Sequence, residues 1–110
     1  MKPYCLFLDD CREVKDIDWI DLPSHINWVV VRNFEQFETY IKLHGVPTTI
    51  SLDHDLNSTE LNGMDCVKWL VEFCFEHNHK FPEYYLHTLN DAGKKNMKSY
   101  IESYLKSQKL

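Results

Sequence analysis

The chain has 110 residues, enough for one domain with a single hydrophobic core and no disulfide staples. Its formal net charge is −5: residues 1–55 hold 10 acids against 5 basic residues, whereas residues 91–110 hold 5 lysines against 2 acids. Proteins that bind duplexes present a broad basic face, so this distribution excludes a general duplex nucleic-acid surface and leaves room only for a local phosphate pocket.

Four short segments rich in β-forming residues predict strands, at residues 4–8, 27–31, 48–52 and 84–88. All but the last are continuous apolar or β-branched runs, which are typical of strands covered on both faces of a parallel sheet. Residues 11–26 contain at most a short helix before Pro23, yet they are long enough for a crossover between two parallel strands.

Three segments with helical periodicity alternate with the later strands. The first begins after Asn33, a good N-cap with Gln36 at capping-box spacing, and ends near Gly45. The second begins near Gly63. The third carries a continuous apolar stripe and follows Asp91, which we expect to act as its N-cap.

The resulting order, β(α)βαβαβα, predicts an open α/β sheet with right-handed crossovers, folded as one domain over residues 1–110. In the flavodoxin-like order 2-1-3-4, the first, third and fourth strands are neighbours, and ligands bind beyond their carboxyl ends. Acids or imidazoles follow all three of these ends: Asp9 and Asp10, then Asp53, His54 and Asp55, then His87. Acids this close repel one another unless a cation lies among them, so the pattern predicts a divalent metal site.

Each part of this cluster also has a simpler interpretation. Asp9 and Asp10 alone are typical of a solvated turn. The pair His54 and Asp55 follows a strand and not a helix, which argues against an HD-type phosphohydrolase. Only the convergence of three strand ends favours a functional site. We expect the four remaining histidines on the surface: His25, His44, His77 and His79.

Two further features indicate phosphate binding. Arg12 follows the acid pair closely, and its planar guanidinium suits bidentate phosphate recognition. Residues 90–96, NDAGKKN, open the last helix, where Gly93 permits close backbone approach and Lys94 or Lys95 adds positive charge. An ordinary helix cap with solvated lysines is the alternative for this segment.

The four cysteines, at positions 5, 11, 66 and 74, include no CxxC pair, which favours reduced and mostly buried thiols. The N-terminal apolar stretch is too short for a signal peptide, and no window approaches a membrane span. We therefore expect a soluble, cytoplasmic protein without a membrane partner. The oligomeric state stays open.

Four motifs, FLDDCR (7–12), SLDHDL (51–56), NGMD (62–65) and HTLNDAGKKNM (87–97), together resemble one known family. This is the cyclic-phosphate-processing receiver-like family, with its LDDxR, LDHDL and H-[ST]-x-N-x-x-G-x-x-N-M motifs, and the resemblance covers nearly the whole chain. It implies a receiver-like sheet of about four strands, without the fifth strand and lysine of full receivers. The polar motif positions map onto Asp9, Asp10, Arg12, Asp53, His54, Asp55, His87, Asn90, Gly93 and Asn96.

The match departs from the family pattern at three positions. Thr88 and Lys94 stand where Ser and Arg are commoner, which keeps the hydroxyl and the charge, and Asn57 stands where Gly is usual. Ordinary response-regulator receivers are similar only in part: their acid pair, phosphoacceptor and hydroxyl residue correspond to Asp9 with Asp10, Asp53 and Thr88.

The resemblance and the residues together predict a hydrolase, a metal-dependent phosphoesterase acting on 2′,3′-cyclic phosphate ends of RNA or on small cyclic nucleotides. His87 or His54 would be the general acid, and a covalent route through Asp53 is less favoured. The metal, Mg, Mn, Zn or Fe, would be held by Asp9, Asp10 and Asp53 with His54 or Asp55. The phosphate would be bound by Arg12, Thr88, Asn90, Gly93, Lys94 and Asn96. The alternative is a non-catalytic receiver-like module that is phosphorylated on Asp53 or binds a cyclic nucleotide without turnover.

Overall fold

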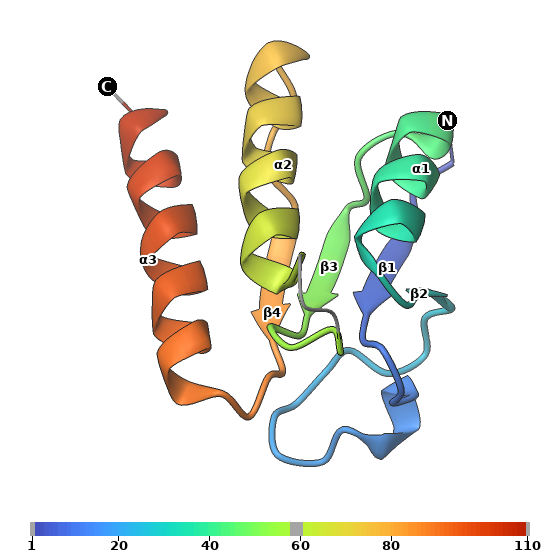
Figure 1. The fold of residues 1–110 in the computed structure, drawn as a ribbon. Helices are drawn as coiled ribbons and strands as arrows, with labels where there is room; N and C mark the ends of the chain where they lie inside the picture. The colour runs from blue at the N-terminus through green and yellow to red at the C-terminus, as the bar shows by residue number, and fades with distance from the viewer. Residues whose placement is uncertain (1, 58–60, 110) are drawn as a thin grey trace.

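The computed structural model of the protein describes residues 2–57 and 61–109. Within them, four parallel strands form one sheet in the order β2-β1-β3-β4 (Figure 1), which confirms the predicted sheet and strand order. No fifth strand follows β4 among the described residues. The elements in chain order are β1 (Cys5–Leu8), η1 (Val14–Asp16), β2 (Trp28–Val31), α1 (Phe34–His44), β3 (Thr49–Leu52), α2 (Gly63–Glu76), β4 (Glu83–Leu86) and α3 (Asp91–Ser107).

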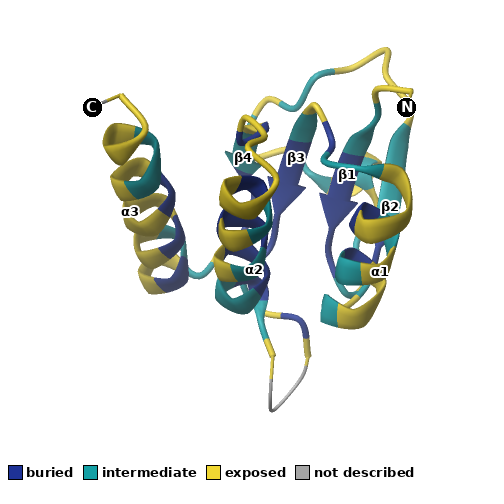
Figure 2. Ribbon diagram, turned by 90° about the horizontal axis from the view of Figure 1, so that it is seen from above, coloured by how far each residue is buried: buried dark blue, intermediate teal, exposed yellow. Residues whose placement is uncertain are grey.

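The three α-helices lie on the same side of the sheet and turn their buried faces towards it (Figure 2). Side chains alternate along a strand, so Leu6 and Leu8 of β1 join the hydrophobic core with these helices, whereas Phe7 points to the opposite face. There Phe7 is fully buried and meets Trp28 edge to face, with ring centroids 6.3 Å apart. The crossover from β1 to β2 contains only the short 3-10 helix η1, as its sequence predicted.

Helix capping follows the sequence for α1 and departs from it for α3. The Asn33 side chain accepts a hydrogen bond from the Gln36 backbone N–H at 2.8 Å, as expected for a capping box. The Gln36 side chain, however, accepts from the backbone N–H of Arg32 and not from that of Asn33. The prediction that Asp91 caps α3 is wrong. Asn90 is the N-cap because its side-chain oxygen reaches the N–H of the third helical residue at 2.9 Å, and Asp91 becomes the first residue of the helix.

All four cysteines are free; Cys66 and Cys74 are buried, Cys5 is half-buried and Cys11 is exposed. The expectation of mostly buried thiols therefore holds for two of the four. In the part of the chain that the structure describes, no helix has the length and apolar character needed to cross a bilayer. The four histidines expected on the surface are exposed: His25, His44, His77 and His79.

Candidate functional site at the carboxyl edge of the sheet

Three neighbouring strand ends bring three titratable side chains together. The parallel ladder continues one residue beyond the strands, because the Asp53 N–H donates to Leu8 O at 3.0 Å and the His87 N–H donates to Leu52 O at 3.1 Å. Asp9, Asp53 and His87 consequently lie in a row, each no more than 3% exposed. One ligand atom from each lies within 4.8 Å of the other two.

The carboxylate of Asp9 is held by four donors. Its Oδ1 accepts from the backbone N–H groups of Cys11 (3.0 Å) and Arg12 (2.9 Å), and its Oδ2 accepts from His87 Nε2 (3.0 Å) and Arg12 Nη1 (3.4 Å). Burial alone would raise the pKa of Asp9, but these hydrogen bonds outweigh burial and lower the pKa below its ordinary value. Asp9 is therefore an ionised, fixed carboxylate.

The neighbouring carboxylate of Asp53 has the opposite electrostatic character. Burial and then the negative charge of Asp9 raise its pKa, against smaller opposing effects of the Thr88 hydroxyl and the His54 backbone N–H. Arg12 Nη1 lies 3.9 Å from Asp53 Oδ2 and 3.4 Å from Asp9 Oδ2. The guanidinium thus stands between two buried carboxylates and supplies the positive charge that they lack.

A divalent metal fits this donor set. Asp9 belongs to two groups whose ligand atoms converge within 4.8 Å, one with Asp53 and His87 and the other with Asp10 and Cys11. Carboxylate oxygens suit Mg²⁺ or Mn²⁺, and the imidazole or thiol would favour Zn²⁺. A cation at the two buried carboxylates would compete for them with the Arg12 guanidinium.

His87 lies behind the carboxylates and not at the protein surface. Its side chain is fully buried, and both ring nitrogens are engaged, Nε2 with Asp9 and Nδ1 with Ser51 Oγ at 2.7 Å. Burial lowers the pKa of His87, and the nearby Asp9 offsets this effect only in part. The neutral imidazole therefore supports Asp9 and has no exposed nitrogen for a substrate.

His54 and Asp55 form a separate pair nearer to solvent. His54 Nδ1 lies 2.9 Å from Asp55 Oδ1, and the Asn90 amide donates to both Asp55 oxygens at 3.3 Å. These hydrogen bonds lower the pKa of Asp55, and the bond with His54 has the largest effect. Neither residue belongs to the converging metal groups found among the described residues.

The His54 ring packs on Gly93, where an added Cβ would lie only 2.4 Å from His54 Cγ. Gly93 thus makes room for an imidazole.

An open pocket of about 420 Å³ lies over this edge. Among the residues predicted to bind phosphate, Arg12, Thr88 and Asn90 line it, whereas Gly93 and Lys94 lie in the first turn of α3. Asn96 lies elsewhere, in the groove between α2 and α3. The remaining lining residues are Asp10, Cys11, Asp53, Asp55, Asn57 and Leu89.

Asn57, at the pocket wall, has the left-handed backbone conformation, with φ 52°. This conformation favours glycine, and asparagine is one of the few other residues that adopt it readily. The structure therefore gives a physical reason for the glycine that is usual at this position in the family resembled by the sequence, and for its replacement by asparagine here.

Two residues that position the site were not found by sequence reasoning. The Trp19 indole N–H donates to the His87 carbonyl at 2.8 Å, and the Arg12 guanidinium lies 5.3 Å from the centre of the Trp19 ring. Arg32 Nη1 donates to the carbonyls of Asp9 (3.2 Å) and Arg12 (2.7 Å). Trp19 is the only tryptophan of the crossover, residues 11–26, and no pattern in the sequence marks either residue as part of the site.

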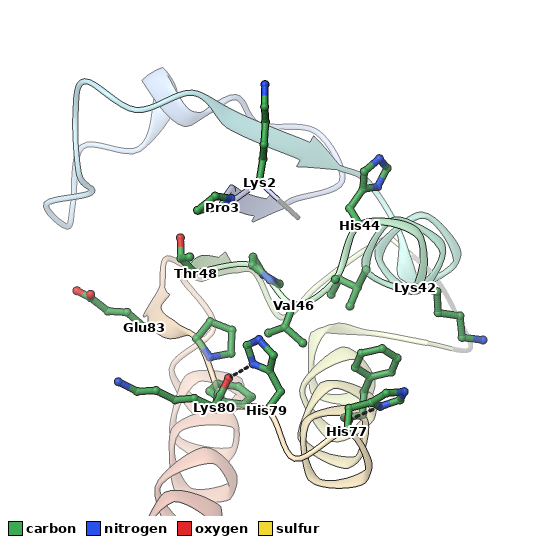
Figure 3. A pocket seen from close by; sticks show the side chains of 16 residues that line it. Lys2, Pro3, Lys42, His44, Val46, Thr48, His77, His79, Lys80 and Glu83 are labelled. Atoms are coloured by element: carbon green, nitrogen blue, oxygen red, sulfur yellow. Dashed lines mark hydrogen bonds between the residues drawn. The ribbon is translucent and has the colours of Figure 1, made fainter.

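A larger hollow, about 810 Å³, lies at the opposite, amino-terminal edge of the sheet (Figure 3). Lysines and histidines surround it, but in Figure 3 the side chains of Lys2, Lys42 and Lys80 point in different directions, away from one another. His79 Nδ1 is engaged with the Lys80 carbonyl at 2.7 Å and His77 Nδ1 with a helix carbonyl at 2.8 Å. Among the described residues that line this hollow, Glu83 is the only acid, whereas acids converge at the carboxyl edge.

Comparison with known proteins agrees with these observations. A family model described as the cyclic-phosphate processing receiver domain matches residues 4–103, a range that includes all four strands and every residue of the site. Neither curated proteins nor solved structures give a match. The resemblance recognised in the motifs is confirmed, and the chain belongs to the family of cyclic-phosphate processing receiver domains.

Proposed function

We propose that this domain is a metal-dependent phosphoesterase that hydrolyses a cyclic phosphate, at the end of an RNA or in a small cyclic nucleotide. The observation that carries the proposal is the pair of buried carboxylates, Asp9 and Asp53, which share the single guanidinium of Arg12 beneath an open pocket. Two anions and one cation leave a net negative charge that a divalent metal would neutralise. Membership of a cyclic-phosphate processing family supports the same substrate class.

Asp9, Asp53 and Asp10 would hold the metal. A divalent cation in this position supplies positive charge for the phosphoryl oxygens and makes water a stronger acid. Arg12, when it leaves the two carboxylates, keeps its backbone anchored by the bond from Arg32 to its carbonyl. Its guanidinium then binds the phosphate, together with the Thr88 hydroxyl in the same pocket.

Proton transfer to the leaving ribose oxygen is assigned to His54 in preference to His87. The His54 side chain is 16% exposed and has Asp55 as its hydrogen-bond partner, whereas the His87 side chain is fully buried with both nitrogens engaged. The Asp55 carboxylate on one ring nitrogen orients the His54 imidazole, and a general acid must be held in place within reach of the leaving oxygen. His87 acts indirectly, by holding Asp9.

The competing hypothesis is a receiver-like binding module. The hydrogen bond of Thr88 to Asp53 favours it, because receivers pair a hydroxyl with their phosphoacceptor acid. Against it, Asp53 is only 3% exposed and shares Arg12 with Asp9, so its carboxylate is shielded from a phosphoryl donor. Turnover separates the two hypotheses, because a module would bind the cyclic nucleotide or accept one phosphoryl group without multiple turnovers.

The test uses metal-free protein with 2′,3′-cyclic and 3′,5′-cyclic mononucleotides and an RNA that ends in a 2′,3′-cyclic phosphate. Each is assayed with Mg²⁺, Mn²⁺ or Zn²⁺, with and without a chelator. We expect multiple turnovers of one substrate class, lost with the chelator and in Asp10→Asn but kept in Asp21→Asn, a matched change at an exposed acid of the crossover. Turnover that survives the chelator, or stoichiometric binding alone, contradicts the proposal.

The length of the RNA gives a second discrimination. Because the chain has a net charge of −5 and the proposal gives it one phosphate pocket, a mononucleotide and a long RNA with the same cyclic end should bind with similar affinity. Affinity that rises steeply with RNA length and falls steeply with salt would indicate that many phosphates are contacted, and would exclude the pocket as the main binding site.

A further inference from the structure

Ser51 is a buried polar residue in the middle of an otherwise apolar strand. On β3 it stands between Phe7 of β1 and Tyr85 of β4, and its side chain is fully buried. A hydroxyl in this position is costly unless it is hydrogen-bonded. Its partner is His87 Nδ1, at 2.7 Å, on the face of the sheet opposite the three helices.

The His87 ring is fixed on every side by this arrangement. Its plane is parallel to that of Phe7, with an angle of 3° and centroids 4.5 Å apart. At its far nitrogen, Nε2 meets Asp9 Oδ2 at 3.0 Å. An ionised carboxylate only accepts, so Nε2 must carry the proton, and in a neutral ring Nδ1 then has a lone pair that accepts from the Ser51 hydroxyl. A continuous buried chain therefore runs from Ser51 through His87 to Asp9.

We propose that Ser51 is a positioning residue for the metal site, because its hydroxyl holds the His87 ring in the tautomer and orientation that fix Asp9 Oδ2. This inference rests on the proposed function of the same site. Losing the direct hydrogen-bond partner of a ligand typically weakens metal binding by about 10- to 100-fold. Ser51 lies one hydrogen bond further from Asp9, behind His87, so the loss of its hydroxyl should have a smaller effect. Without the hydroxyl, Nδ1 would be a buried acceptor with no donor, and the ring would lose its preferred orientation.

A purely steric role for Ser51 is the alternative. A small residue between Phe7 and Tyr85 leaves space for the imidazole, and any residue of that size would then suffice. The positioning role requires the hydroxyl of residue 51, and the steric role does not. Ser51→Thr and Ser51→Val introduce side chains of nearly the same shape, and only the threonine keeps a hydroxyl.

The experiment compares these two variants with the parent by Mn²⁺ binding to the metal-free protein and by the ¹⁵N chemical shifts of His87. We expect Ser51→Val to bind Mn²⁺ more weakly than Ser51→Thr, by up to about tenfold. In the valine variant alone, the Nδ1 resonance should move to that of an acceptor without a hydrogen bond. Thr49→Val is the matched control, since it removes a hydroxyl from the same strand two residues away, and it should change neither measurement.

Equal Mn²⁺ affinity and equal His87 shifts in the threonine and valine variants would overturn the inference. The ¹⁵N shifts need no metal, so they decide the role of Ser51 even where the parent fails to bind Mn²⁺, a result that would contradict the proposed function instead. Unchanged His87 shifts in Ser51→Val then refute the positioning role, and a displaced Nδ1 resonance supports it.

Discussion

Replacing Gly93 by alanine is expected to lower the activity strongly while leaving the fold intact. The added Cβ would lie 2.4 Å from Cγ, 2.6 Å from Cδ2 and 2.9 Å from Nδ1 of His54. Ordinary van der Waals contact begins at 3.4 Å, so the imidazole must move by about 1 Å. A displacement of this size costs about 100-fold in rate where a reacting group is misplaced. Alanine also gains up to about 1 kcal/mol of helix propensity at this position, which offsets the strain.

The assays are turnover of the cyclic-phosphate substrate, urea unfolding and the His54 ring resonances. We expect about a 100-fold lower kcat, a free energy of unfolding within about 1 kcal/mol of the parent and shifted His54 signals. Gly63→Ala is the matched contrast, because its Cβ would lie 2.0 Å from the backbone oxygen of Asp53, and backbone cannot rotate away. That variant should lose about 1–3 kcal/mol of stability. Parental turnover and unchanged His54 signals in Gly93→Ala would refute the claim that Gly93 makes room for a catalytic His54 ring.

Three other expectations follow from the site and the core. His54→Asn should lower kcat by about 100-fold or more with Mn²⁺ affinity kept, and parental turnover in this variant would exclude His54 as the general acid. Asp53→Asn should stabilise the metal-free protein against urea, because burial and the charge of Asp9 disfavour the Asp53 carboxylate. Added Mn²⁺ should then stabilise the parent but not the variant, and a metal-free variant less stable than the parent would contradict this electrostatic account. Burial raises the pKa of Cys74 to about 12, so mass spectrometry should find it unalkylated by iodoacetamide in native protein at pH 9 while exposed Cys11 reacts, and equal labelling would be evidence against the buried thiol.

The sheet could be predicted because each strand leaves a local signature in the sequence. Three of the four strands are runs of mainly apolar or β-branched residues, and parallel pairing in register brings their carboxyl ends to one edge. That geometry alone accounts for the meeting of Asp9, Asp53 and His87. The strand order 2-1-3-4 was taken from flavodoxin-like sheets, and the structure confirms it.

The roles of individual side chains could not be predicted in the same way. Which way a residue points after a strand ends depends on the path of the loop, and the crossover from β1 to β2 has no periodicity that would place Trp19 over Arg12. His87 was predicted as a general acid from its position at the end of a strand. Its burial, however, depends on which face of the sheet its side chain lies on, and the sequence does not indicate that face. Ser51 was visible as a polar residue in an apolar strand, but its partner was not.

The most direct test of the central claim is whether metal and phosphate meet at Asp9 and Asp53. Mn²⁺ is paramagnetic, so it broadens the ³¹P resonance of a nearby phosphate. We predict strong broadening of the signal of a bound cyclic nucleotide in the Mn²⁺-loaded protein, abolished in Asp53→Asn and retained in Asp21→Asn. A cyclic nucleotide that binds without broadening, or whose broadening survives in Asp53→Asn, would contradict a shared metal and phosphate site at the carboxyl edge of the sheet.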